Sequence, residues 1–197
     1  VHENARQMTI FSLRRTQRTD EQLMTAAARG SDDAFAELYN RYARRLQGFF
    51  MRQLRGDREA AADCTHDVFL RAYAARTSWR EGRKVDVWLF TIAYNICRNI
   101  WRHGIHEAAY METQSDSPVT DCEAEAELDA ELFRQALRTT LATLRPDDRM
   151  MFSLHYEEEL TVPEIAQIYT MPEGTVKSRL HRIMTNIKQK MTQYENK

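Results

Sequence analysis

The chain has 197 residues, a formal net charge of −1 and a hydrophobic fraction of 43%, with only 6 glycines and 4 prolines. So few glycines and prolines favour helices over a turn-rich β fold. The sequence contains no run of about 18 apolar residues, which a membrane span would require, and the N-terminus lacks the apolar stretch of a secretory signal. Cys64, Cys97 and Cys122 form neither a disulfide framework nor a CxxC metal motif, so we expect a reducing, cytoplasmic setting.

Charge is strongly segregated along the chain. Residues 71–103 carry seven cations and two carboxylates, and residues 171–191 carry five cations and one carboxylate. Between them, residues 104–131 carry nine carboxylates and no lysine or arginine. This pattern predicts two basic modules joined by an acidic tether.

Residues 1–19 form a basic N-terminal tail, and residues 20–103 are expected to fold as a bundle of four helices. We expect Asp20 to cap a short first helix, Asp32 to cap a long second one, and Gly56 to end that second helix. A charged loop, 78–84, precedes a fourth helix capped by Asp86. The apolar residues expected to face the core of the bundle include Phe35, Tyr39, Leu46, Phe49, Val68, Phe69, Tyr73, Trp88, Leu89, Ile92, Ala93, Ile96 and Ile100.

Residues 104–127 are predicted to be a flexible acidic linker because their apolar content is low. A second helical domain, 128–194, follows. Its first helix has an apolar stripe that includes Phe133, Leu137 and Leu141, and we expect Pro146 to end it and Asp147 to cap the next. The predicted fold is therefore all-α, with two small helical domains.

The stretch 161–182, TVPEIAQIYTMPEGTVKSRLHR, reads as a helix-turn-helix. Thr161 and Glu164 form a capping box, and Pro172 suits the start of the second helix. Val176, Leu180, Ile183 and Ile187 recur at helical spacing and should face inward. The opposite face is cationic and hydroxyl-bearing, as a recognition helix requires, although an ordinary solvated amphipathic helix pair has the same periodicity.

With its GTVKSRLHR segment, this stretch resembles region 4 of bacterial sigma factors of the sigma-70 family, specifically the extracytoplasmic-function (ECF) group. The resemblance implies that the second helix reads the promoter −35 element. Lys177, Ser178 and His181 are the candidates for base edges, and Arg179 and Arg182 are the candidates for phosphates. The full −35 set is Glu173, Thr175, Lys177, Ser178, Arg179, His181 and Arg182. Thr170 stands where the family usually has glycine, so a positive φ there would be strained.

The third helix contains AADCTHDVFLRAY, in which Asp63, His66 and Asp67 share one exposed face. This face could be simply solvated, could be part of a metal site, or could dock a basic partner. It resembles sigma region 2.2, which binds the β′ clamp helices of core RNA polymerase, although the family usually has Gln and Glu in place of His66 and Asp67.

The fourth helix, VWLFTIAYNICRNIWRH, resembles sigma regions 2.3 and 2.4, which open the −10 element and capture a flipped base. Amide and guanidinium groups on its exposed side and on the preceding loop can contact bases and phosphates. Trp88 is expected in the core, Tyr94 replaces a common Arg, and the loop could also be an ordinary basic surface. The −10 candidates are Trp79, Arg80, Arg83, Lys84, Asn95, Arg98, Asn99 and Arg102.

Together these resemblances imply a non-enzymatic sigma factor that needs no cofactor or metal. It would act in the bacterial cytoplasm, on the nucleoid during initiation. Its expected partners are core RNA polymerase (β′ clamp helices and β flap), promoter DNA and an anti-sigma factor. The linker would thread the polymerase cleft or serve only as a tether. The alternatives are a stand-alone helix-turn-helix regulator, a non-DNA adaptor, and a helical metalloenzyme built on Asp63, His66 and Asp67.

Overall fold

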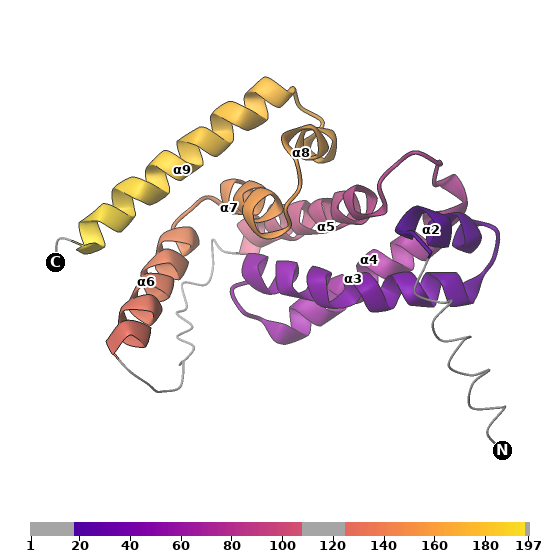
Figure 1. Ribbon diagram of the computed structural model, residues 1–197, viewed down its shortest axis with the longest axis horizontal. Coiled ribbons are helices and arrows are strands. Elements are labelled where there is room, and N and C mark those ends of the chain that lie inside the picture. Colours follow the sequence, from indigo (N-terminus) through magenta and orange to yellow (C-terminus); the bar gives the residue numbers. More distant parts are fainter. Residues whose placement is uncertain (1–17, 108–124, 196–197) are drawn as a thin grey trace, which may run out of the picture.

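The computed structural model describes residues 18–107 and 125–195, and these residues form helices and no strand (Figure 1). The all-α prediction is confirmed for this part of the chain. Most of the predicted basic tail (1–17) and most of the predicted acidic linker (108–124) lie outside the described residues. The ends of the predicted linker are helical, since residues 104–107 and 125–127 belong to the helices on either side.

The first helical group consists of α2 (Asp20–Ala28), α3 (Asp32–Gln53), α4 (Arg58–Ala75) and α5 (Val85–Glu107), with a short 3₁₀ turn, η1 (Arg76–Ser78), after α4. Helix α3 packs against α2 and α4, and α4 packs against α5. Phe49 and Phe90 meet edge to face with their ring centroids 5.3 Å apart, and both are fully buried. The four predicted helices are thus present and surround one core.

The helix caps differ by one residue from the predicted ones. Thr19 and Ser31, not Asp20 and Asp32, accept hydrogen bonds from the first turns of α2 and α3. The aspartates lie inside the first turn, where their charge interacts favourably with the helix dipole. Asp20 also accepts a hydrogen bond from Arg41 at 2.6 Å, which ties α2 to α3.

The second helical group consists of α6 (Glu125–Ala142), α7 (Pro146–Phe152), a π-helical turn η2 (Ser153–Glu157), α8 (Val162–Tyr169) and α9 (Glu173–Glu195). Pro146 begins α7 and does not end α6, because a proline at the first helical position needs no N–H partner. Asp147 therefore lies in the first turn of α7, with Arg145 at the cap. The buried core of this group includes Met150, Met151, Leu154, Ile165, Val176, Leu180, Ile183 and Ile187.

Several apolar residues that we expected in the core are exposed. Ile100 lies on the solvent side of α5, and Phe133 lies on the solvent side of α6. Tyr39 and Tyr73 are also exposed, although their rings contact Phe69 and Phe35, respectively. Each of these residues is at the edge of an otherwise correct apolar stripe, where helical periodicity cannot distinguish the core from its rim.

The two helical groups contact each other directly, through α5 against α8 and α3 against α7 (Figure 1). At this contact Tyr94 of α5 packs on Tyr169 of α8, with ring centroids 4.5 Å apart. None of the helices that the structure describes has the length and apolar character that a bilayer crossing requires.

Candidate nucleic-acid interface

Helix α9 has the two faces that the sequence predicted. Val176, Leu180, Ile183 and Ile187 are buried against the rest of the second helical group. The opposite face is exposed over about two turns, and its side chains could enter a DNA groove. The exposed residues of the predicted −35 set are Glu173, Thr175, Lys177, Ser178, His181 and Arg182.

The turn that positions α9 depends on Thr170. This residue caps α8 in the left-handed conformation, with φ 53° and ψ 49°, and the amide of Met171 donates to the carbonyl of Ala166 at 3.0 Å. A β-branched side chain at positive φ costs roughly 1–2 kcal/mol. The strain expected from the sequence is therefore present, and the turn geometry that normally requires glycine is kept.

Arg179 is placed differently from the prediction. Its side chain is only 17% exposed and donates to Asp147 at 2.6 Å and to Asp148 at 2.7 Å. Burial raises the pKa of Asp148, but hydrogen bonds from Arg179 and Arg145 outweigh it and hold that pKa below its usual range. Arg179 therefore joins α9 to α7, and in this structure it is not on the face expected to contact phosphates.

The neighbouring Arg182 remains available. Its side chain is 61% exposed and its Nη2 lies 3.5 Å from Asp148 Oδ1, a loose ion pair at the edge of the buried cluster. Ser178 donates its hydroxyl to the carbonyl of Gly174 at 2.8 Å, so it would meet a base edge mainly as an acceptor. Lys177 and His181 are also exposed.

Helix α5 carries the second cluster of predicted DNA-binding residues. Asn95, Arg98, Asn99 and Arg102 are all exposed and recur at steps of three and four along the helix. The guanidinium of Arg98 lies over the Tyr94 ring, 5.6 Å from its centroid. Tyr94, which replaces a common Arg of the family, is buried and contributes packing at this position.

The loop before α5 presents cations but not its tryptophan. Arg80, Arg83 and Lys84 are exposed, whereas Trp79 is 8% exposed and belongs to the core of the first helical group. In this structure Trp79 therefore supports the loop and does not form the exposed wall that we expected. The Nζ of Lys84 lies 2.6 Å from a carboxylate oxygen of Glu164, the residue that also caps α8.

The predicted docking face on α4 is exposed. Asp63 and His66 are exposed, and Asp67 is half-buried and accepts a hydrogen bond from Arg71 at 2.9 Å. Leu70, one turn further along the same face, is 55% exposed. Leu70 was not among the residues predicted for this face, although its spacing from His66 and Asp67 places it there. Across residues 18–107 and 125–195, no group of three or more His, Cys, Asp or Glu side chains is arranged to hold a metal ion.

Two segments of the chain, which include these surfaces, match known protein families. Residues 38–104 match the family described as Sigma-70 region 2, and residues 134–187 match the one described as Sigma-70, region 4. The first match spans the α4 face, the loop before α5 and most of α5. The second spans the whole helix-turn-helix.

Curated relatives align over most of their length. The RNA polymerase sigma factor CarQ of Myxococcus xanthus is 33% identical over 153 residues, which cover 78% of this chain and 86% of CarQ. The RNA polymerase sigma-H factor of Pseudomonas aeruginosa is 30% identical over 182 residues, 85% of this chain and 91% of that factor. The ECF RNA polymerase sigma-E factor of Escherichia coli is 29% identical over 191 residues, 89% of this chain and 95% of that factor.

Solved structures share the fold. CnrH in complex with the cytosolic domain of CnrY superposes with a TM-score of 0.64 at 24% identity, over 86% of this chain and 95% of that one. RpoE in complex with the anti-sigma factor NepR from Bartonella quintana superposes with a TM-score of 0.63 at 21% identity, over 80% of this chain and 96% of that one. With the sequence matches over both helical groups, the chain belongs to the sigma-70 family of RNA polymerase sigma factors, in its extracytoplasmic-function group.

Proposed function

We propose that this chain is a promoter-specificity subunit, which binds core RNA polymerase and directs it to promoters through their −10 and −35 elements. Its action is recognition and not catalysis. Such a role requires two DNA-binding surfaces on separately placed helical groups. The exposed cationic faces of α9 and of α5 with its preceding loop meet that requirement.

The −35 element is assigned to the second helical group, residues 128–194. The observation that carries this assignment is the exposed face of α9, with Lys177 and His181 free above a buried stripe. Arg182 would contact a phosphate and so contribute affinity without sequence information. Arg179 is left out of the revised −35 set because it is held by Asp147 and Asp148.

The −10 element and the polymerase are assigned to the first helical group, residues 20–103. Arg80, Arg83 and Lys84 of the loop would hold phosphates, and the exposed amides of Asn95 and Asn99 are suited to base edges. The face of Asp63, His66 and Asp67, extended by Leu70, would dock on the β′ clamp helices of core polymerase. An apolar side chain beside carboxylates is suited to the centre of a docking surface with a charged rim.

The remaining assignments concern partners outside the promoter. The β flap of the polymerase would hold the second helical group, and residues 104–127 would cross the polymerase cleft or act as a tether. RpoE of Bartonella quintana, which shares the fold, is bound to the anti-sigma factor NepR, and this supports control of the present chain by an anti-sigma factor as well. Its place of action would be the bacterial cytoplasm, on the nucleoid during initiation.

Run-off transcription with purified core polymerase on a promoter library tests this function. We expect specific start sites only when the chain is added, and no start sites from a promoter whose −35 element is scrambled. A gel shift without polymerase separates the alternative, because a stand-alone helix-turn-helix regulator would bind its operator tightly by itself. Failure to associate with core polymerase in the absence of any inhibitor would refute the proposal.

A further inference from the structure

A buried carboxylate links the two helical groups. Glu158, the residue after η2, is 3% exposed, and its side chain accepts hydrogen bonds from two arginines of α3. Arg45 donates from Nε at 2.6 Å, and Arg52 donates from Nη2. Arg45 also donates to the main-chain carbonyl of Glu158. A buried charge is stable only with such partners, and both of these belong to the other helical group.

The two arginines are held in place for this contact. They are seven residues apart on α3, two helical turns, so they share a face. The guanidinium of Arg45 lies 5.0 Å from the centroid of the Phe90 ring. Arg52 also lies 2.6 Å from a carboxylate oxygen of Glu157, the last residue of η2. The contact is therefore a network in which Glu158 is the central and most buried member.

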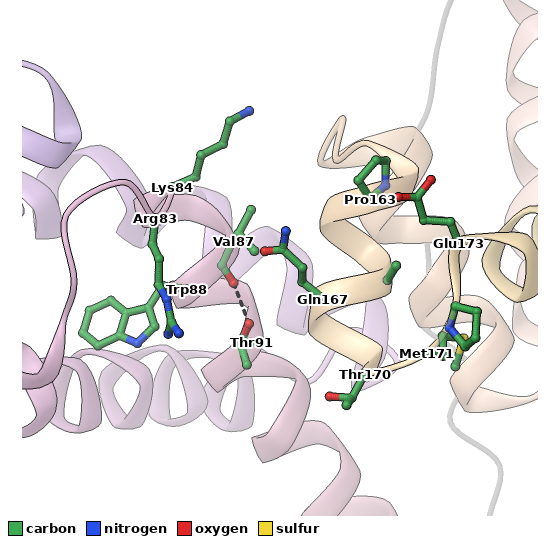
Figure 2. A pocket seen from close by; sticks show the side chains of 12 residues that line it. Arg83, Lys84, Val87, Trp88, Thr91, Pro163, Gln167, Thr170, Met171 and Glu173 are labelled. Atoms are coloured by element: carbon green, nitrogen blue, oxygen red, sulfur yellow. Dashed lines mark hydrogen bonds between the residues drawn. The ribbon is translucent and has the colours of Figure 1, made fainter.

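A second ion pair closes another part of the contact. Lys84 belongs to the loop assigned to the −10 element, and it pairs at 2.6 Å with Glu164 of the helix-turn-helix. Arg83, Lys84 and Glu173 line one groove of about 800 Å³, which Trp88 and Thr170 also line (Figure 2). Residues assigned to the −10 and −35 elements thus face the same space.

This arrangement does not fit a promoter. The −10 and −35 elements are named for their positions along the DNA, so they lie about 25 base pairs apart. This is roughly 85 Å along straight B-DNA at 3.4 Å per step. Side chains that line a single groove cannot reach both elements. Nor can DNA contact Lys84 fully while Glu164 holds it. The helical groups must therefore separate before the chain engages both elements.

We propose that the structure is a closed state of the free chain, and that Glu158 between Arg45 and Arg52 is the latch that keeps it closed. Opening removes Glu158 from its partners, exposes the charges of Glu158, Arg45 and Arg52 to water, and frees Lys84. The closed and open states form an equilibrium that any partner of the open state shifts. The latch is a property of the free chain, while its consequence for promoter binding rests on the proposed function.

Zero-length carbodiimide coupling measures closure at a site away from the latch. In the wild-type full-length chain, the amine of Lys84 and the carboxylate of Glu164 should couple, and mass spectrometry of the digest should identify the joined peptides. In Glu158→Gln the ratio of closed to open chains should fall at least tenfold, the change produced by about 1.4 kcal/mol of lost closure, and the coupling yield should fall with it. Small-angle scattering should show a larger maximum dimension for this variant.

The matched control is Glu159→Gln. It removes the same charge one residue further on, where the side chain is exposed and the backbone keeps φ 59°. We expect wild-type coupling and scattering from it. Equal coupling yields in the wild type, Glu158→Gln and Glu159→Gln would overturn the latch, and so would a wild-type chain that is extended and does not couple.

A second variant tests the latch independently, in case Glu158→Gln does not fold. Arg52→Gln removes one latch partner from the other helical group, at a half-exposed position, and should also reduce coupling and extend the chain. Arg44→Gln, exposed on the same helix, is its control. Circular dichroism must show wild-type helicity in all variants. Opening by Glu158→Gln without opening by Arg52→Gln would contradict the network as described.

Run-off transcription with core polymerase is measured separately on the same proteins. If the wild type couples Lys84 to Glu164 but starts no transcription, the proposed function fails and the latch stands. If the wild type starts transcription but neither couples nor is compact, the latch fails and the function stands. If the latch limits promoter binding, Glu158→Gln should start transcription at a lower protein concentration than the wild type.

Discussion

The recognition helix α9 presents Lys177, His181 and Arg182 to solvent, whereas the loop before α5 has Trp79 in the core and Lys84 paired with Glu164. One DNA-binding surface is therefore ready in the free chain, and the other is partly engaged with its own molecule. The difference follows from tertiary contacts, because both surfaces have similar cationic sequences.

Trp79→Ala should have the largest effect. Removing a buried indole from the core of the first helical group is expected to cost about 3–5 kcal/mol of unfolding free energy. Urea denaturation measures this loss. If the main role of Trp79 were to stack on an opened base, Trp79→Ala would keep its stability and lose only promoter opening.

Arg179→Ala should destabilise the second helical group by roughly 3 kcal/mol, because it leaves the buried Asp148 with fewer partners. Arg182→Ala is the matched control on the same helix. It should leave the denaturation midpoint unchanged, weaken binding to all DNA sequences similarly and reduce the salt dependence of binding. A stable Arg179→Ala protein with weak DNA binding would return Arg179 to the DNA-binding surface.

Acid should weaken the same cluster. The pKa of Asp148 is lower in the folded chain than its usual value near 3.9 because of Arg179 and Arg145. A group of this kind stabilises the fold above its unfolded-state pKa, and the contribution is lost as the pH falls through the lower, folded-state pKa. The stability difference between wild type and Asp148→Asn should therefore be full above about pH 5 and shrink below about pH 4. Denaturation curves at several pH values measure it, and a difference independent of pH would contradict this assignment.

Lys177→Ala should remove base discrimination without affecting the fold. A good base contact is worth about 1–3 kcal/mol between matched and mismatched sequences. Holoenzyme binding to matched and scrambled −35 DNA gives the difference directly. If Lys177→Ala weakened both equally, Lys177 would be a phosphate contact.

Thr170→Gly should have the smallest effect and the opposite sign. Glycine adopts the observed φ of 53° without the penalty of a β-branched residue, so we expect stabilisation of about 1 kcal/mol or less and unchanged DNA binding. Glycine also gains entropy in the unfolded chain, which limits the benefit. A large fall in melting temperature would show that the Thr170 side chain makes an essential contact.

The sequence was most informative where interactions are local. The capping box of Thr161 and Glu164, the buried stripe of α9 and the strained turn at Thr170 all follow from residues within one or two helical turns. The partners of Arg179 could not be predicted, because Asp147 and Asp148 lie more than thirty residues earlier in the chain. Periodicity places Arg179 near the solvent boundary and cannot show which carboxylates meet it there.

The contact between the helical groups could not be predicted for the same reason. Glu158 and Arg45 are separated by 113 positions, and neither belongs to a recognisable motif. Trp79 lies in an irregular loop, where no periodicity distinguishes a buried side chain from an exposed one. Tyr94 was noted as unusual for the family, but only the packing of its ring on Tyr169 shows what the tyrosine does.

Glu164 accepts the amide hydrogen of Thr161 at 2.7 Å and also pairs with Lys84. Burial raises its pKa, but the hydrogen bonds from Lys84 and Thr161 outweigh it and keep the carboxyl ionised. Local helix initiation and long-range domain contact thus share a single side chain. An apolar replacement would therefore free Lys84 and also leave the Thr161 amide without its side-chain acceptor, whereas Gln would keep the cap and remove only the charge that holds Lys84.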